Sequence, residues 1–178
     1  MNIHVSKDMF NPIYLPLLED YEHRYITLYG GSGSGKSDFG FMKAIWKAIN
    51  YPGRTFLVIR KVQKTLKKSC WRLVNRILRR LKIFNTCKIN KTDMEIELEN
   101  GSLFMFSGLD DPEKIKSIDG VDDIIIEEAT DLDKYDFLQL DLRLRSDKGM
   151  NQIMLFFNPI GKDNWVYKYF FSDEPEYD

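Results

Sequence analysis

Cysteine is scarce in this sequence, with Cys70 and Cys87 the only two among 178 residues. Their spacing is not that of a metal site, and two isolated thiols are more typical of reduced, partly buried side chains than of a disulfide. Long apolar runs are missing too, because none approaches the roughly 18–20 residues of a membrane span. The amino terminus also lacks a secretory pattern. We therefore expect a cytoplasmic protein that does not enter a membrane.

Acidic residues are absent from a long internal window. Between Arg54 and Thr92 there is no Asp or Glu, although the window holds 13 of the 26 basic residues, and the net charge of the whole chain is −1. A helix predicted from about Gln63 to Lys82 carries basic side chains at i, i+4 spacing: Lys64, Lys68, Arg72, Arg76 and Arg80. Such a row can follow a phosphate backbone. It is equally compatible with a solvated face or with a contact to another subunit or domain.

Internal repeats and low-complexity segments are absent as well. Hydrophobic residues make up 43% and charged residues 30% of the sequence, which is an ordinary globular composition. The length is enough for one sizeable α/β core, so we expect a single domain.

The most informative stretch reads G-x-x-x-x-G-K-S, the Walker A phosphate loop, and follows a strand-like run at residues 24–29. Its glycines lack a Cβ, so the backbone can wrap around an anion and direct N–H groups at phosphate oxygens. The lysine adds a positive charge, the serine hydroxyl suits Mg²⁺, and the following helix points its positive end at the phosphates. We predict a nucleotide site made of Gly30, Gly31, Ser32, Gly33, Ser34, Gly35, Lys36 and Ser37.

The hydrophobic pattern around this loop predicts an α/β fold, and the Walker A motif assigns that fold to the P-loop NTPase (ASCE, RecA-like) class. Continuous apolar runs at 55–59, 124–126 and 152–157 are typical of strands buried on both faces. Helical spacing follows the phosphate loop as far as about residue 49 and recurs at 63–82, 133–145 and 165–171. Shorter strands are expected at 83–90, 94–99 and 103–106, with a hairpin turn at Asn100-Gly101, and a turn and short helix at 107–117. We expect a mainly parallel sheet with helices on both faces and a β-hairpin excursion.

Polar residues follow two of the predicted buried strands. Glu127 and Glu128 come directly after Ile124-Ile125-Ile126, at the strand end where open α/β sheets bind ligands. In a P-loop enzyme the first carboxylate holds the Mg²⁺ shell and the second orients the attacking water, so Glu127 takes the metal role and Glu128 that of the base. Asn158 follows the strand at 152–157 and can sense the γ-phosphate through its amide, although Asn-Pro is also a common turn.

Aromatic residues stand in the lead-in before the first strand. In many P-loop enzymes such a segment covers the adenine, so Tyr14 or Tyr21 can be interpreted as stacking on the base. Packing of these rings against the core is the simpler expectation.

Five runs occur in an order that resembles a known family. They are Gly30–Ser37, the strand end Val58-Ile59-Arg60-Lys61, the run Gly108-Leu109-Asp110-Asp111-Pro112 with Lys116-Ser117, Glu127-Glu128-Ala129, and Phe157-Asn158-Pro159. Together they resemble the ATPase domain of the large terminase subunit of tailed bacteriophages, over nearly the whole chain from about Asn11. The resemblance implies an ATP- and Mg²⁺-dependent motor that packages double-stranded DNA into a prohead.

The resemblance also implies partners and roles. The partners are double-stranded DNA, the portal protein and the small terminase subunit, in the cytoplasm of an infected bacterium, with the motor working as a homo-oligomeric ring and the isolated domain a monomer. It assigns Lys36 and Ser37 to phosphate and Mg²⁺, Glu127 to the Walker B position, Glu128 to catalysis and Asn158 to the coupling motif.

Two departures from the family pattern alter these expectations. Many members have Arg within the phosphate loop where this chain has Ser32, so Arg143 or Arg145 becomes the candidate arginine finger for a neighbour's γ-phosphate. A salt bridge with Asp141 is the alternative reading of these arginines. Glu127 is one methylene longer than the usual Asp, which moves the metal contact outward or through water.

The resemblance predicts a division of the chain into a lead-in at 1–23 covering the nucleotide site, an ATPase domain at 24–171, and the start of a linker at 172–178. Family members continue into a nuclease domain, whose two-metal chemistry needs a separate carboxylate cluster that this sequence lacks. We therefore expect weak ATP hydrolysis and no DNA cleavage. The alternatives are a helicase-like translocase and a nucleotide-binding assembly module without turnover.

Overall fold

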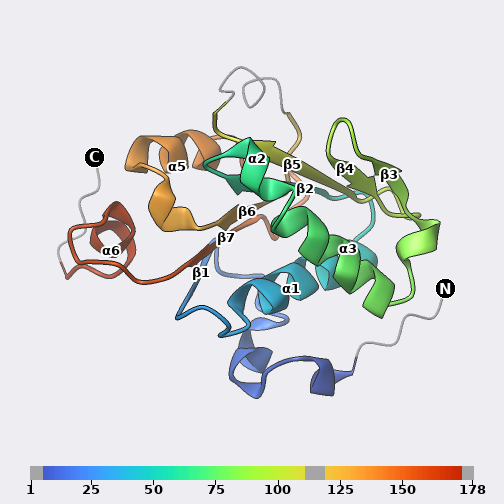
Figure 1. Ribbon diagram of the computed structural model, residues 1–178, viewed down its shortest axis with the longest axis horizontal. Helices are drawn as coiled ribbons and strands as arrows, with labels where there is room; N and C mark the ends of the chain where they lie inside the picture. The colour runs from blue at the N-terminus through green and yellow to red at the C-terminus, as the bar shows by residue number, and fades with distance from the viewer. Residues whose placement is uncertain (1–5, 111–118, 174–178) are drawn as a thin grey trace.

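The computed structural model describes residues 6–110 and 119–173 (Figure 1). In chain order its main elements are β1 (Tyr25–Tyr29), α1 (Lys36–Asn50), β2 (Thr55–Arg60), α2 (Gln63–Leu66), α3 (Cys70–Arg80), β3 (Lys88–Asn90), β4 (Glu95–Glu97), β5 (Leu103–Gly108), β6 (Asp123–Glu127), α5 (Lys134–Asp141), β7 (Gln152–Phe157) and α6 (Trp165–Phe170). Short 3₁₀ turns are η1 (Lys7–Met9), η2 (Pro12–Leu17), η3 (Phe84–Thr86) and η4 (Ala129–Asp131).

The described strands form one sheet in the order β1-β7-β6-β2-β5-β4-β3. The first five run parallel, and β4 and β3 add to β5 as an antiparallel extension. This confirms the expected mainly parallel sheet with a hairpin excursion. Because β1, β7, β6 and β2 are parallel, the loops at their carboxyl ends all emerge at one edge of the sheet.

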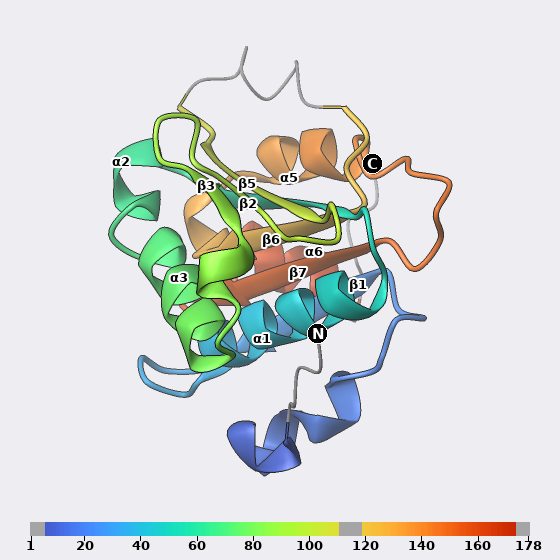
Figure 2. The same ribbon diagram turned by 90° about the vertical axis from the view of Figure 1, so that its right-hand side faces the viewer.

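Helices cover both faces of the sheet, as expected. Figure 2 shows α1 and α3 on one face and α5 on the other. Alternation along the strands divides the core accordingly, since Phe56 and Val58 of β2 face the α1 side while Leu57 and Ile59 face the α5 side. The hydrophobic clusters on the two faces of the sheet are both buried. The polar residues at the strand ends are therefore attached to a rigid, well-packed sheet.

The helix expected at 63–82 is broken, which corrects the sequence prediction. Helix α2 ends at Leu66 and α3 begins at Cys70, with Ser69 outside the helical region (φ −108°, ψ −92°). The Ser69 hydroxyl donates to the Thr65 carbonyl oxygen and accepts from Arg60 Nη1. The Ser69 amide donates to the same Thr65 carbonyl at 3.1 Å. Because the backbone of Ser69 leaves the helical region, the predicted basic row does not lie on one straight helix.

The helix expected at 133–145 is also shorter, because α5 ends at Asp141. In a continued helix the Asp141 carbonyl would accept from the Arg145 amide, but it accepts from the Leu144 amide and from Arg24 Nη2, both at 3.1 Å. The Arg145 amide donates to the carbonyl of Arg143. Arg143 and Arg145 therefore lie in the irregular segment after the helix.

Several smaller expectations can be compared with the structure. The strand expected at 83–90 begins as η3 and is regular only over β3, while α6 lies where helical spacing predicted it. Cys70 is buried and Cys87 half-buried, both as free thiols, and burial raises the pKa of Cys70 to about 12. Most of the expected turn and short helix at 107–117 falls outside the described residues. Within the described ranges no helix has the length and apolarity to cross a membrane.

Candidate nucleotide-binding site

The phosphate loop joins β1 to α1 at the carboxyl edge of the sheet. Gly33 (φ 83°) and Gly35 (φ 82°) adopt left-handed conformations that side chains disfavour, so these two positions depend on glycine. The Gly30 amide donates to the Phe157 carbonyl at 3.3 Å, which fastens the start of the loop to the end of β7. Helix α1 begins directly after the loop, with its free amide groups at the loop's end.

Lys36 is the loop's buried cation. Its side chain is largely covered, and Nζ donates to Asn158 Oδ1 at 2.8 Å and to the carbonyls of Gly30 and Gly31 at 3.1 and 3.4 Å. An ammonium surrounded by neutral oxygens can exchange one of them for a phosphate oxygen, to which its attraction is stronger. The structure thus brings Asn158, from the end of β7, into contact with the phosphate-loop lysine.

Ser37 and Glu127 meet across the same site. The Ser37 hydroxyl donates to Glu127 Oε1 at 2.9 Å, although the two residues are 90 positions apart. The other carboxylate oxygen, Oε2, is buried and has no hydrogen-bond partner in the described part of the chain. Burial raises the pKa of the Glu127 carboxyl; the Ser37 hydrogen bond opposes this shift and the Glu128 charge adds to it. A serine hydroxyl beside a buried, partly unsatisfied carboxylate is the oxygen-rich environment that Mg²⁺ prefers.

Glu128 lies next to Glu127 but turns away from the core. Its backbone is left-handed (φ 55°, ψ 53°) and starts the turn η4, and about a third of its side chain is exposed. Arg60, at the end of β2, approaches Glu128 Oε1 at 3.9 Å while donating to Ser69 at 3.0 Å. Glu128 is therefore accessible to a water molecule and faces a fixed cation.

The sequence places Arg60 in the strand-end run Val58-Ile59-Arg60-Lys61 and leaves open whether it is an arginine finger, but it does not place Arg60 beside Glu128. Arg60 also belongs to the acid-free window, among many other basic residues. The available signal was its position at the carboxyl end of a buried central strand, where Glu127 and Asn158 also stand.

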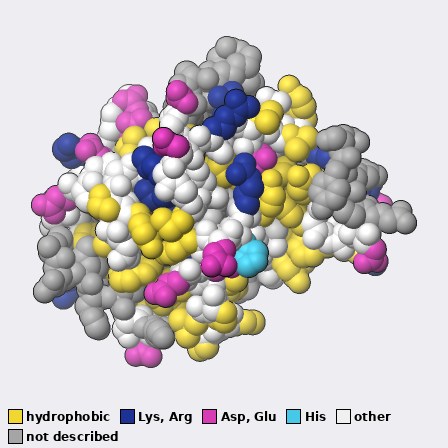
Figure 3. Space-filling model, turned by 180° about the vertical axis from the view of Figure 1, so that it is seen from behind, with side chains coloured by type: hydrophobic (Ala, Val, Ile, Leu, Met, Phe, Trp, Pro, Cys, Tyr) yellow, Lys and Arg dark blue, Asp and Glu magenta, His cyan; other side chains and the backbone are white. Residues whose placement is uncertain are grey.

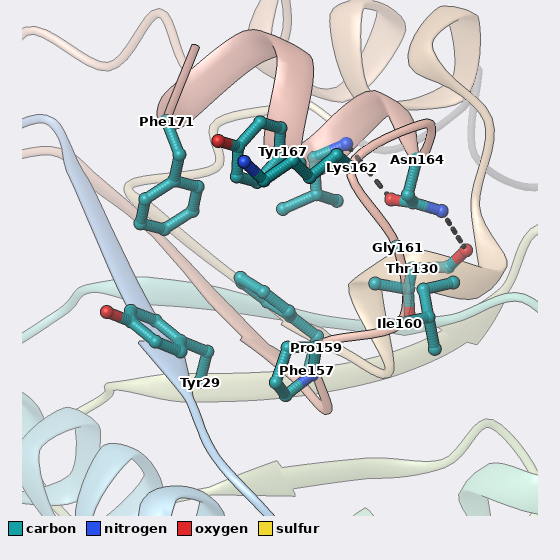
Figure 4. A pocket seen from close by; sticks show the side chains of 11 residues that line it. Tyr29, Thr130, Phe157, Pro159, Ile160, Gly161, Lys162, Asn164, Tyr167 and Phe171 are labelled. Carbon is teal, nitrogen blue, oxygen red and sulfur yellow. Dashed lines mark hydrogen bonds between the residues drawn. The ribbon is translucent and has the colours of Figure 1, made fainter.

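A cavity of about 300 Å³ adjoins this site where β1 and β7 end, under α6 (Figure 4). Its walls are mainly apolar, with Tyr29 stacked on Phe157 at 5.9 Å and Phe171 edge-on to both. Asn164 closes one side by donating to the Thr130 carbonyl. Such apolar walls do not suit phosphate groups, which are served by the loop beside it.

A family model described as phage terminase large subunit matches residues 22–178. The chain belongs to this family. The PBSX phage terminase large subunit of Bacillus subtilis (strain 168) is 33% identical to this chain over 164 residues. The matched region is 92% of this chain and 38% of that protein. This terminase chain thus spans about two fifths of the length of that relative.

Solved structures show the same fold. The large terminase of a thermophilic bacteriophage, in complex with ATP-γ-S, superposes with a TM-score of 0.70 at 16% identity, covering 93% of this terminase chain and 43% of that one. The N-terminal domain of the DNA packaging ATPase from bacteriophage phi29 gives 0.66 at 18% identity, over 90% of this chain and 84% of that one. These similarities establish that the terminase chain has the fold of a packaging ATPase domain.

The lead-in of the terminase chain contacts the phosphate loop through Tyr14. The Tyr14 ring stacks on Phe39 of α1 at 4.8 Å, and its hydroxyl donates to the Ser34 carbonyl at 3.2 Å. Of the two interpretations of Tyr14, packing against the core is the one observed, and the packing places it directly against the loop.

Tyr21 lies at the other end of α1. Its ring packs edge-on against Tyr51, and Lys43 Nζ lies 4.3 Å from the ring centroid. Lys43 also donates to the carbonyls of Leu17 and Asp20, at 2.7 and 2.6 Å, which holds the lead-in along the helix. Tyr21 is therefore a packing residue, remote from the phosphate loop.

Arg143 and Arg145 do not join the phosphate-loop site of their own chain. They follow Asp141, which bonds Arg24 and Tyr25 at the amino end of β1, whereas the phosphate loop follows the carboxyl end of that strand. The carboxylate of Asp141, suggested as the partner of these arginines, is engaged by Arg24 and Tyr25. The finger role for a neighbouring subunit stays a prediction.

Proposed function

We propose that this chain is the ATP-hydrolysing motor domain of a terminase that packages double-stranded viral DNA. The observation that carries the proposal is the meeting of three strand ends around the phosphate loop. Asn158 contacts Lys36, Ser37 contacts Glu127, and Glu128 stands beside them on an accessible turn. This is the arrangement that phosphoryl transfer to water requires, because catalysis there is mostly positioning and charge stabilisation.

Each residue then has a chemical task. Amides of the loop 30–35 and the Lys36 ammonium hold the β- and γ-phosphates of ATP. Glu128 accepts a proton from the attacking water, whose oxygen bonds to the γ-phosphorus while the bond from that phosphorus to the ADP oxygen breaks. Asn158 exchanges its contact with Lys36 for one with the γ-phosphate, so its position reports whether that phosphate is present.

The donor set also fits Mg²⁺. The Ser37 hydroxyl and the Glu127 carboxylate, with its unpartnered buried oxygen, would hold the ion. Bound there, Mg²⁺ neutralises charge on the β- and γ-phosphates.

The domain organisation and partners belong to the same proposal. Residues 1–23 form the lead-in, 24–171 the ATPase domain and 172–178 the start of a linker toward a nuclease domain. The motor acts on double-stranded DNA with the portal protein and the small terminase subunit, as a ring assembled in the cytoplasm of the infected bacterium. The isolated domain is a monomer with weak ATP hydrolysis and no nuclease activity.

The test separates nucleotide binding from turnover. We expect Lys36→Ala to abolish ATP binding, measured by titration calorimetry. Glu128→Gln should retain binding but lose about 10²–10⁴ in kcat, the range for a missing general base. Glu99→Gln, an exposed glutamate away from the site, is the matched control. Unchanged hydrolysis by Glu128→Gln, with binding lost in Lys36→Ala, would refute the assignment of the base.

A second measurement distinguishes a packaging motor from a helicase-like translocase. Binding to a portal or prohead, and ATP-dependent protection of double-stranded DNA from added nuclease, are expected of a packaging motor. Strand separation of a duplex without portal binding would favour the helicase alternative.

A further inference from the structure

Many cations of the acid-free window are already engaged within the fold. Arg76 and Arg80 of α3 approach the Asp38 carboxylate at 3.6 and 3.0 Å, next to the phosphate loop. Arg79 lies 3.4 Å from the centroid of the Phe84 ring, and Lys88 pairs with a neighbouring glutamate. These residues stabilise the molecule, so the basic row read from the sequence overstates the charge available to a partner.

Six exposed cations of the window have no such contact within the described residues, and four of the six are close together in the chain. Lys64, Lys67, Lys68 and Arg72 are exposed and form no ion pair or hydrogen bond from their side chains within the described residues. They occupy α2, the break at 67–69 and the first turn of α3. We call these four residues the elbow cluster, because the chain bends there between the two helices.

The elbow cluster lies at the same edge of the sheet as the nucleotide site. Helix α2 begins three residues after the carboxyl end of β2, and Gln63 accepts a hydrogen bond from the Gly108 amide at the end of β5 (Figure 1). Leu66, fully buried between these positions, anchors α2 to the core. The cluster is therefore carried by a fixed element rather than by a free loop.

The side of the molecule opposite to the view of Figure 1 has a mixed surface. Figure 3, which shows the opposite face, has acidic and basic side chains interspersed with hydrophobic ones. Outside the window, Arg24 pairs with Asp141 and Lys148 pairs with Asp122, so these cations are neutralised within the fold. The elbow cluster thus groups four exposed positive charges that have no carboxylate partner within the described residues.

We propose that the elbow cluster binds the phosphate backbone of double-stranded DNA. The inference rests on the proposed packaging function and names the surface that meets the substrate. Three of the four residues are lysines, which are depleted in protein–protein interfaces but bind phosphates as point charges. Contacts to phosphate carry no sequence information, as a motor that moves any DNA sequence requires.

The test compares two triple variants of the full-length protein with equal loss of charge. The first is K64Q/K67Q/K68Q, and the control is K82Q/K91Q/K168Q, which removes three exposed lysines from other places. Affinity for a random-sequence DNA duplex is measured by fluorescence anisotropy at several salt concentrations. We expect the first variant to bind about tenfold or more weakly at low salt, and its dependence of log K on log salt to flatten by about one per lysine removed. The control should stay close to wild type.

Each alternative outcome is decisive. Unchanged affinity and salt dependence in the first variant, or an equal loss in both variants, would overturn the assignment of the surface. Normal DNA binding with loss of portal binding would identify the cluster as a protein interface and also overturn it. Hydrolysis of ATP without DNA is measured in parallel. If the wild-type protein does not hydrolyse ATP, the proposed function is wrong. If only the surface assignment is wrong, ATP hydrolysis by the wild type is still observed. Circular dichroism confirms that both variants are folded.

Discussion

At the scale of single residues, Glu127 shows how function and stability conflict. Its Oε1 accepts from Ser37, but Oε2 is buried without a partner in the described residues. A buried, unsatisfied polar atom costs roughly 1–3 kcal/mol. The proposed magnesium role explains why a carboxylate stands at a position that destabilises the nucleotide-free protein.

The burial of this carboxylate predicts that Glu127→Gln stabilises the nucleotide-free protein at neutral pH, by on the order of 1 kcal/mol, because the neutral amide avoids the cost of burying a charge. Burial raises the pKa of Glu127, so between the unfolded and folded pKa values the folded state binds more protons. Stability of the wild type therefore falls as pH rises through that window, and the advantage of the variant grows. Urea unfolding in EDTA at several pH values measures the difference. Glu99→Gln should show none, and a variant less stable than wild type at neutral pH would contradict the argument.

The sequence could predict those site residues that lie in motifs at the ends of strands. Lys36, Ser37, Glu127 and Asn158 lie in motifs at strand ends, and parallel strands deliver their ends to one edge, so their proximity follows from the fold class. The position of Arg60 against Glu128 depends on side-chain geometry. No periodicity encodes that contact.

At the scale of elements, α1 and β7 are in unusually close contact. A Cβ built on Gly40 of α1 would lie 1.9 Å from the Phe156 ring of β7, and that ring is fully buried. Glycine within a helix is unfavourable by roughly 1 kcal/mol relative to alanine, so the close packing must outweigh this cost. The helix that begins with Lys36 is thereby pressed onto the strand that leads to Asn158.

We predict that Gly40→Ala lowers the free energy of unfolding by about 1–3 kcal/mol, despite the better helix propensity of alanine, because the core must shift to accept one methyl group. The midpoint of urea denaturation gives the measurement. Gly161→Ala is the control, since the nearest atom to its added Cβ is 4.0 Å away. A Gly40→Ala protein as stable as wild type would mean that Phe156 can move without loss.

Helix boundaries were the least predictable elements, for a physical reason. At the break at Ser69 and at the end of α5 at Asp141, an arginine from outside the helix, Arg60 or Arg24, donates a hydrogen bond to the chain. Local spacing of apolar residues continues through both positions, so the sequence pattern favoured longer helices. The buried strands were predicted well because short, continuous apolar runs are typical of strands that are buried on both faces.

At the scale of the whole molecule, the edge opposite the nucleotide site is fastened by buried charges. Asp123, at the start of β6, pairs with Lys47 at 2.6 Å and with Arg54 at 2.9 Å. Arg54 also donates to the carbonyl of Gly149 at 3.1 Å, in the loop that carries Arg143 and Arg145. These buried charges hold the loop to the sheet, so the segment that carries the two arginines is attached to a rigid part of the fold.

We predict that Arg143→Ala or Arg145→Ala lowers ATP hydrolysis only in the assembled ring, by about 10³–10⁵ if the residue is an arginine finger. Mixing with Glu128→Ala subunits should restore part of the activity, because those subunits supply the missing finger to an intact base. Steady-state phosphate release from mixed assemblies is the measurement, with Lys168→Ala as an exposed control. A monomer that hydrolyses ATP at full rate, or no rescue on mixing, would contradict the finger assignment.

The separation of these arginines from the phosphate loop constrains how copies can fit together. If the arginine-bearing loop of one subunit reaches the nucleotide of the next, each interface joins two different surfaces. Every contact is then heterologous, and all subunits have the same orientation in the ring. Such a ring has a direction of rotation and two unlike faces. A symmetric pair of subunits joined through identical surfaces would leave both nucleotides without their partner arginine.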